Sequence, residues 1–208
     1  MDETVFNYKN YVDGIQSLRN SVGEKDQYTL GHSDRVSDFA VLIGKKMGLP
    51  EEEIQTLKIG GLCHDIGKIG IEDSILFKET RLSDDEFAKM KRHPAIGVEM
   101  LENKAIFKKI IPIVKYHHER YDGKGYPDNL AGEQIPLLAR ITSVADAFDA
   151  MSSKRTYNAV MDVNAIKQEF QNNRGTQFDP IATDVFVDIL ENEYDKIQKI
   201  QEKYQTKK

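Results

Sequence analysis

The chain has 208 residues, of which 39% are hydrophobic and 30% charged, and its 29 basic and 34 acidic residues give a net charge of −5. These values are ordinary for one globular domain, or one domain with a helical appendage, and they exclude disorder as the main state. The mildly acidic balance argues against a protein whose main function is to coat nucleic acid. A single cysteine excludes a disulfide framework, and no segment has the roughly 18 apolar residues that a membrane span needs. Because the N-terminus also lacks the pattern of a signal peptide, we expect a cytoplasmic protein.

Apolar residues recur at steps of three and four along the first part of the chain, which predicts two helices. The first runs from about Val5 to Val22, and a polar break over residues 23–27 follows it. The second helix carries apolar residues from Val36 to Met47 on one side.

Helix-start signals continue through the middle of the chain. Pro50 precedes three glutamates, a pattern that favours a helix N-terminus, and we expect this helix to extend to about Gly67. The Ser-Asp-Asp-Glu segment at 83–86 predicts a capping box that opens another helix. We expect Pro94 to open the next helix, and residues 106–118 to form one more.

The second half of the chain alternates between a loop and further helices. Residues 123–134 contain four Gly or Pro residues and form the clearest predicted loop, followed by a helix over about 136–151. Asp162 is expected to cap a helix that Gly175 ends, and Asp179-Pro180 to start a last, long helix. No convincing run of alternating strand residues occurs, so the predicted fold class is all-α.

The chemistry-bearing residues of this chain are its histidines and the acids beside them. The histidines are His32, His64, His93, His117 and His118. His64 is followed by Asp65, and Lys68 would share a broad helical face with both. Asp146 lies in a helix rich in alanine, which would let other groups approach its carboxylate closely.

Imidazole and carboxylate ligands without thiolate suit Fe, Mn, Zn and related divalent metals. Seven such groups exceed what one ion normally takes from protein, but two ions sharing a carboxylate would use them all and could clamp a phosphate. Lys68 would add positive charge beside the phosphoryl oxygens. The spacing alone leaves simpler roles open, because a lone histidine is often a packed or surface residue and the pair at 117–118 could be the cationic end of a helix.

Several segments resemble one known family. His64-Asp65 with the downstream Asp146 resembles the HD superfamily of metal-dependent phosphohydrolases, and HHERYDGKGYP at 117–127 is similar to the signature of its HD-GYP subfamily. The similarity extends over about residues 24–185. It includes DQYTLGH at 26–32, HDIGKIGIEDSIL at 64–76, His93-Pro94, the helix that ends near Asp149, Arg155 with Tyr157, and the segment 175–180.

The resemblance implies a compact helical domain that hydrolyses cyclic di-GMP, a bacterial second messenger, to linear pGpG and then GMP. It implies two divalent ions, Fe or Mn foremost, with Zn, Ni or Co left open, and a bridging hydroxide as nucleophile. One ion would be held by His32, His64, Asp65 and Asp146, and the other by the bridging Asp65 with His93, His117 and His118. Asp65 and Lys68 would be the catalytic residues. The substrate contacts would be Lys68, Tyr126, Arg155, Asp26, Gly123 and Gly125.

Under this interpretation residues 1–23 form an N-terminal connecting or packing helix, 24–190 the HD-GYP catalytic domain, and 191–208 a C-terminal helical extension. Three positions depart from the family pattern. Tyr28 stands where some members have a glutamate that holds a third metal, which predicts a two-metal site. Asn158 replaces a cation found in some members and leaves the nucleotide preference open, whereas Tyr121 replaces the more usual Trp with little expected effect.

Two alternatives to cyclic di-GMP hydrolysis remain at this point. The same site could act on another cyclic dinucleotide, such as cyclic GMP-AMP. Alternatively, the chain could be a catalytically weak docking module for diguanylate cyclase (GGDEF) domains. A homodimer through the C-terminal stretch and a sensory domain elsewhere in a longer protein are also left open, whereas no nucleic-acid polymer or membrane partner is expected.

Overall fold

The structure is a computed structural model that describes residues 27–153 and 161–204. These ranges contain helices and no named strand, which confirms the all-α class. The predicted helix over 5–22 lies outside the described residues. The α-helices are α2 Gln27–Lys46, α3 Glu51–Cys63, α4 Asp73–Leu76, α5 Asp84–Met90, α6 His93–Leu101, α7 Ile111–Tyr116, α8 Leu137–Ser152, α9 Val163–Asn172, α10 Pro180–Asn192 and α11 Tyr194–Lys203. Three short 3-10 helices are η1 Ile66–Gly70, η2 Ala105–Phe107 and η3 Gly132–Gln134.

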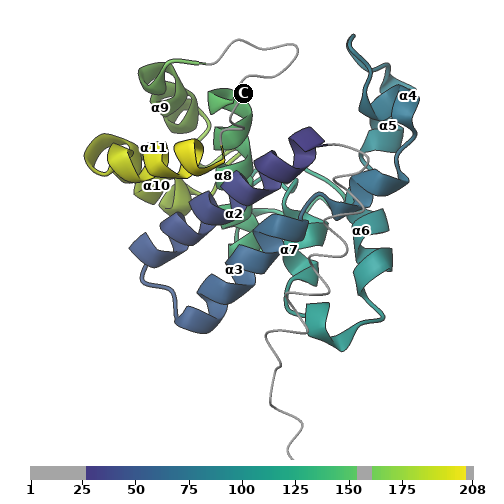
Figure 1. Cartoon of the computed structure of the whole chain (residues 1–208), viewed down its shortest axis with the longest axis horizontal. Coiled ribbons are helices and arrows are strands. Elements are labelled where there is room, and N and C mark those ends of the chain that lie inside the picture. The colour runs from purple at the N-terminus through teal and green to yellow at the C-terminus, as the bar shows by residue number, and fades with distance from the viewer. Residues whose placement is uncertain (1–26, 154–160, 205–208) are drawn as a thin grey trace, which may run out of the picture.

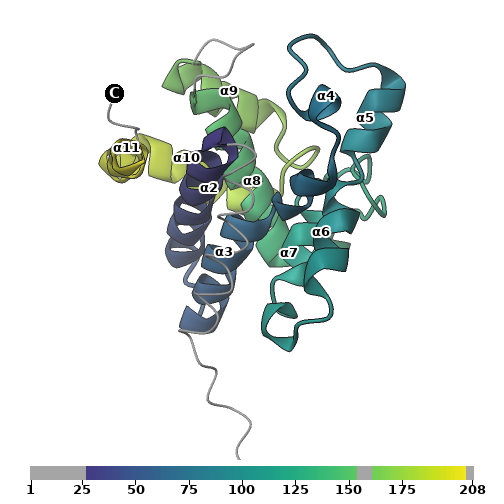
Figure 2. The ribbon, with the colours of Figure 1, turned by 45° about the vertical axis from the view of Figure 1, so that its right-hand side comes forward.

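The apolar side chains gather in two clusters. The larger one joins α2, α8, α9 and α10, with Phe39, Phe148 and Phe186 fully or almost fully buried. The smaller one lies among α3, α6 and α7 and includes Cys63 and Val114. Both views show α10 and α11 on one side of α8, and α4 to α6 on the other (Figures 1 and 2). The two clusters bury the apolar surface that stabilises the fold.

The helix expected to extend to Gly67 ends earlier, and this corrects the prediction. The helix α3 stops at Cys63, and the chain bends at Asp65 (φ −99°, ψ 9°) before the 3-10 helix η1. The cause is a close approach to α6, because a Cβ at Gly67 would lie 1.9 Å from the carbonyl oxygen of His93. His64, Asp65 and Lys68 therefore surround a bend and do not share the face of one continuous helix.

The single helix predicted over residues 106–118 is also wrong. The structure has η2, a turn, and then α7, which begins at Ile111 with Pro112 in its first turn. Proline lacks the N–H that a helix interior needs, and it restricts the residue before it, so a continuous helix is interrupted there. The second piece is short and ends with His117 at its C-cap.

The helices at the C-terminal end differ from expectation in their boundaries. The predicted last helix is divided at Glu193 (φ −137°), and the second piece brings Ile197 into the larger cluster. Lys203 and Tyr204 then reach Asp38 on α2, at 2.8 and 2.9 Å. The helix capped by Asp162 ends at Asn172 with Asn173 as its C-cap, three residues before the expected Gly175.

Other local predictions are confirmed. The capping box at Ser83 and Glu86 has both of its hydrogen bonds, and α6 begins beside Pro94. The carboxylate of Asp179 caps α10 by accepting from the N–H of Ala182. Among the described helices, none combines the length and the apolar character needed to cross a membrane.

Candidate metal centre

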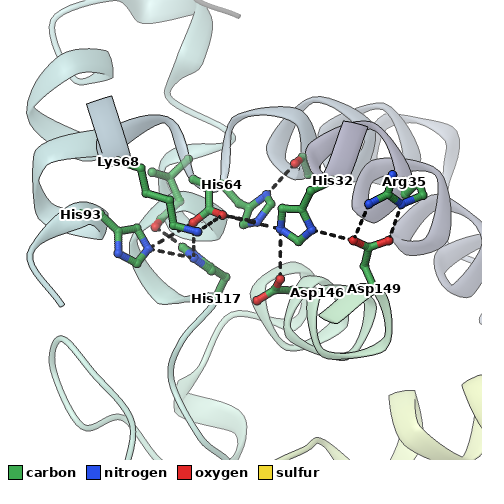
Figure 3. Close-up of polar contacts among 11 residues, drawn as sticks. His32, Arg35, His64, Lys68, His93, His117, Asp146 and Asp149 are labelled. Carbon is green, nitrogen blue, oxygen red and sulfur yellow. Dashed lines mark hydrogen bonds and ion pairs between the residues drawn. The ribbon is translucent and has the colours of Figure 1, made fainter. Parts of the chain in front are cut away.

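The predicted ligands are brought together where five helices meet. His32 comes from α2, His64 and Asp65 from the bend after α3, His93 from the start of α6, the pair at 117–118 from the end of α7, and Asp146 from α8. The close-up shows the side chains of five of these ligands pointing toward one another between the helices: His32, His64, His93, His117 and Asp146 (Figure 3). Residues next to His64, Asp65 and Asp146 belong to the two apolar clusters, so packing of the helices helps to place these ligands.

The carboxylate of Asp65 lies between two groups of histidines. Its Oδ2 atom is 3.3 Å from Nε2 of His64 and 3.6 Å from Nε2 of His32. Its Oδ1 atom is 3.3 Å from Nε2 of His93 and 3.8 Å from Nε2 of His117. One oxygen therefore faces each group, which is the arrangement that a carboxylate shared by two ions would have.

Two sets of ligand atoms are close enough to hold an ion. The first set, defined here as the His32 position, consists of His32, His64 and Asp65. The second set, the His93 position, consists of Asp65 with His93, His117 and His118. Within each set the ligand atoms lie within 4.8 Å of one another. Asp146 approaches the first set from the His32 side, with Oδ1 3.2 Å from Nε2.

The protonation of the rings makes these sets suitable for cations. The Nδ1 atoms of three histidines donate to main-chain carbonyl oxygens: His64 to Gly61 at 2.7 Å, His93 to Met90 at 2.9 Å and His117 to Val114 at 3.0 Å. Their Nε2 atoms are then left as lone-pair donors that point into the centre. Nε2 of His93 and Nε2 of His117 face each other at 3.4 Å, a contact between two lone pairs that a cation would relieve.

Buried polar atoms without a partner provide a further test of the fit to a metal. Nε2 of His64 and Oδ1 of Asp65 are buried and have no hydrogen-bond partner. Such atoms are costly unless something binds them, and both are metal-ligand atoms pointing into the predicted site. The residues present therefore fit the divalent metal that the resemblance implies.

The acids and histidines of the centre have strongly shifted pKa values. Burial would raise the pKa of Asp65, but Lys68 and the surrounding histidines outweigh burial and hold it well below its usual range. Burial would likewise raise the pKa of Asp146, yet His32 holds it low. Both carboxylates are therefore ionised at neutral pH.

Among the histidines, burial lowers the pKa at two positions, whereas hydrogen bonds with carboxylates raise the pKa at a third. Burial, with neighbouring histidines, holds the pKa of His118 well below its ordinary value, and burial lowers the pKa of His93 to about 3. Both rings are thus neutral and able to bind metal. Burial also acts to lower the pKa of His32, but hydrogen bonds with Asp146 and Asp149 raise it well above its ordinary value.

Lys68 lies at the open side of the centre. Its ammonium donates to Oδ2 of Asp65 at 2.5 Å, and its side chain is about a quarter exposed. An ammonium that contacts the shared carboxylate and also reaches solvent can neutralise the charge of an anionic ligand arriving from outside.

The predicted loop after His118 covers one wall of the centre. The Tyr126 ring stacks on His118 with centroids 4.9 Å apart, and Gly123 lies in a turn at φ +75°. Gly125 packs so closely that a Cβ there would lie 2.3 Å from the backbone nitrogen of Arg120. The buried Glu119 accepts the N–H of Asp128 through Oε1 at 2.7 Å, which holds the middle of the loop.

Some predicted site residues lie outside the described part of the chain, and some residues near the centre were not predicted from the sequence. Asp26, Arg155 and Asn158 lie outside the described residues. Sequence reasoning assigned no role to Asp149 and Arg35, although Asp149 contacts His32 and Arg35 contacts Asp149. The available signal was spacing, because each lies three residues after a predicted ligand on the same helix.

Comparisons with known proteins agree with this geometry. The family described as HD domain matches residues 16–181. The cyclic di-GMP phosphodiesterase response regulator RpfG of Xanthomonas campestris is 42% identical over 83% of this chain and 46% of its own length. A 3′3′-cGAMP-specific phosphodiesterase of Vibrio cholerae is 34% identical over 84% of this chain and 34% of its own length. Among solved structures, Bd1817, a HDG"Y"P protein from Bdellovibrio bacteriovorus, has a TM-score of 0.66 at 25% identity, covering 80% of this chain and 54% of that chain. This chain thus spans less than half the length of these two curated relatives.

Proposed function

Since this chain belongs to the HD domain family, we propose that it is a metal-dependent phosphodiesterase that hydrolyses a cyclic dinucleotide, with cyclic di-GMP as the first candidate. The single observation that carries the proposal is the position of the Asp65 carboxylate, which has one oxygen facing each of two histidine groups and Lys68 beside it. This arrangement provides ligands for two ions and a cation for a phosphate.

The proposed centre holds one divalent ion between His32, His64, Asp65 and Asp146, and a second between Asp65, His93, His117 and His118. Fe or Mn suits this imidazole and carboxylate set best, and Zn, Ni or Co could also bind it. Two such ions supply Lewis acidity, which activates water and neutralises charge on a phosphodiester.

The side chains around the ligands account for the rest of the proposed reaction. Lys68 stabilises negative charge that develops on the phosphoryl oxygens, and Asp65 holds the Lys68 ammonium in place. Tyr126 and the backbone of the loop at Gly123 and Gly125 form a wall for the nucleotide. Burial raises the pKa of the Tyr126 hydroxyl, so the phenol stays protonated and can donate a hydrogen bond. Asp26 and Arg155 complete the proposed substrate contacts.

The deciding experiment measures metal and turnover on the same preparation. The protein is purified without oxygen and its metal is counted. It is then incubated with cyclic di-GMP or cyclic GMP-AMP and Fe(II) or Mn(II), and the products are resolved by chromatography. Linear pGpG or GMP that disappears with chelator supports the proposal. Asp65→Ala is expected to abolish both metal retention and turnover, and an Asp65→Ala protein that keeps two metals and full activity would refute it.

A second candidate substrate is favoured by the relatives named 3′3′-cGAMP-specific phosphodiesterases and by Asn158 in place of a cation. Comparing the two nucleotides in the same assay decides between them. Two bound metals without cleavage of either nucleotide would instead favour the docking module, whose partners would be diguanylate cyclase domains. A homodimer is a separate part of the proposal. A cytoplasmic location belongs to the same proposal, because cyclic dinucleotides are made inside the cell.

A further inference from the structure

His32 differs from three other histidines of the centre in what holds its ring. His64, His93 and His117 donate from Nδ1 to main-chain carbonyl oxygens. His32 instead donates from Nδ1 to Oδ2 of Asp149, at 2.7 Å. Its opposite nitrogen, Nε2, faces Asp146 and Asp65. The Nδ1 atom of His32 therefore contacts a carboxylate that does not belong to the ligand set (Figure 3). The other three rings contact main-chain carbonyl groups instead.

Asp149 is a fully buried and fully bonded carboxylate. Its side chain has no exposed surface, and Oδ2 accepts from His32 and from Nη2 of Arg35 at 3.0 Å. Oδ1 accepts from Nε of Arg35 at 2.6 Å and from the hydroxyl of Ser153 at 3.2 Å. Burial would raise the pKa of Asp149, but His32 and Arg35 lower it, so the carboxylate is ionised. Such a carboxylate has a fixed orientation and a full negative charge.

Basic side chains of α2 and acidic side chains of α8 alternate along the contact between these two helices. On α2, His32 and Arg35 are three residues apart, and on α8, Asp146 and Asp149 are three residues apart. The pairs therefore interleave, with His32 between the two carboxylates and Arg35 beyond Asp149. Rotation or sliding of either helix would break the contact at His32 and at Arg35 together.

We propose that Asp149, held by Arg35, is a positioning residue that fixes the His32 ring and selectively sets the metal affinity of the His32 position. The inference rests on the proposed function, in that the centre holds two divalent ions. The hydrogen bond keeps a proton on Nδ1, which leaves the Nε2 lone pair for metal, and the negative charge makes the ring a stronger ligand. The His93 position, in which the rings of His93 and His117 donate to carbonyl groups, does not depend on Asp149.

A purely structural role is the rival explanation, because an ion pair between α2 and α8 could simply hold the helices together. The chain contains a matched pair for comparison. Arg140 contacts the buried Asp179 at the start of α10, and this contact has no described link to any predicted ligand. Asp179→Asn therefore perturbs a buried arginine–aspartate pair without touching the centre.

The test titrates chelator-treated protein with Mn(II) and follows free Mn(II) by electron paramagnetic resonance. Wild type is expected to bind two ions. In Asp149→Asn, an amide oxygen at the Oδ1 position keeps the hydrogen bonds from Nε of Arg35 and from the Ser153 hydroxyl. The amide NH2 then takes the Oδ2 position, loses the bond from Nη2 of Arg35 and faces Nδ1 of His32, so the ring proton moves to Nε2. One of the two ions is then expected to bind about 10- to 100-fold more weakly, with the other unchanged. Asp179→Asn is expected to bind both ions normally, with a lower melting temperature.

The same substitution in a His32→Ala background separates positioning from general loss of structure. If Asp149 acts through His32, adding Asp149→Asn to His32→Ala leaves the remaining Mn(II) affinity unchanged. If Asp149→Asn does not fold, Arg35→Lys provides the second variant, because it keeps the charge but loses the bidentate contact. Arg35→Lys is expected to weaken the same single ion to a smaller extent.

Three results would overturn the inference while leaving the proposed function intact. Asp149→Asn could bind both ions with wild-type affinity, or it could bind both ions equally more weakly. The third is that Asp149→Asn lowers the Mn(II) affinity by the same factor in the wild-type and His32→Ala backgrounds. Wild-type protein that binds no Mn(II) would instead refute the proposed two-ion centre itself. The two failures are thus distinguished by the wild-type titration.

Discussion

Lys68 and Asp65 form the contact on which the proposed chemistry depends most directly. Lys68 is the cation nearest the shared carboxylate, yet as an ammonium it cannot be a metal ligand. Its proposed contribution is therefore to stabilise the charge of a phosphate, and its removal should affect turnover more than metal content.

We expect Lys68→Met to lower kcat about 100- to 1,000-fold, because one preorganised donor to a developing oxyanion is lost. Metal content, measured by elemental analysis, should stay at the wild-type level. Lys58→Met is the control, since Lys58 is exposed on α3 and away from the centre. Wild-type turnover by Lys68→Met would contradict the assigned role.

The contrasting pKa shifts of the histidines predict how metal binding depends on pH. The raised pKa of His32 means that its ring is protonated at neutral pH when no metal is bound, and an arriving ion must displace that proton. His93 and His118, with lowered pKa values, have no proton to lose there. Affinity at the His32 position should therefore rise with pH, by up to about tenfold per unit, until the pH reaches the pKa of His32.

Calorimetry in two buffers with different ionisation enthalpies measures this proton release. We expect about one proton to be released when the His32 position fills, and little when the His93 position fills. His32→Ala should remove the release. Equal proton release from both positions in wild type would contradict the assignment.

At the scale of the elements, the bend after α3 decides where two ligands point. Gly67 lets η1 lie against the start of α6, where a Cβ would meet the carbonyl oxygen of His93 at 1.9 Å and the nitrogen of Gly97 at 2.5 Å. Both obstacles are backbone atoms, so neither can rotate away. The same contact that bends the chain at Asp65 therefore sets the distance to His93.

Gly67→Ala should lower the free energy of unfolding by about 3 kcal/mol and reduce metal binding, because η1 and α6 must separate. Urea unfolding and metal titration measure the two effects. Gly48→Ala is the control for conformational strain alone: Gly48 has φ +75° but open space around it, and we expect a loss of about 1 kcal/mol with normal metal binding. A Gly67→Ala protein no less stable than Gly48→Ala would contradict this explanation of the bend.

At the scale of the whole molecule, the centre joins the two apolar clusters. Its ligands come from α2 and α8 of the larger cluster and from helices α6 and α7 of the smaller one, so bound ions would cross-link them. Such ions stabilise the folded chain by mass action, since the unfolded chain has no preformed site.

Removing the metal should therefore lower the melting temperature. At a metal concentration 100 times the Kd, binding contributes about 2.7 kcal/mol, which corresponds to about 5 to 10 °C for a chain of this size. Thermal unfolding followed by circular dichroism with and without chelator measures the shift. Asp65→Ala is the control, and its melting temperature should be the same with and without chelator. A chelator effect of equal size on Asp65→Ala would contradict the prediction.

The sequence alone supported the class of the fold and the ligand set because both depend on local patterns. Apolar periodicity and capping residues predicted most helices, and the capping box at Ser83 and the caps at Asp162 and Asp179 follow from residue chemistry within a few positions. The predicted metal ligands were found by their types, their spacing and the family resemblance. All seven lie in the described residues and converge on one centre.

Only the tertiary structure decided the bend after Cys63, the break at Glu193 and the contact of Asp149 with His32. Each depends on residues far apart in the chain: the bend needs the backbone of α6 against Gly67, the break brings the last helix onto α2, and the carboxylate of Asp149 reaches His32 across 117 positions. Local propensity contains no information about such contacts. They arise because close packing of helices selects, from several locally acceptable conformations, the one whose backbone and buried charges fit their neighbours.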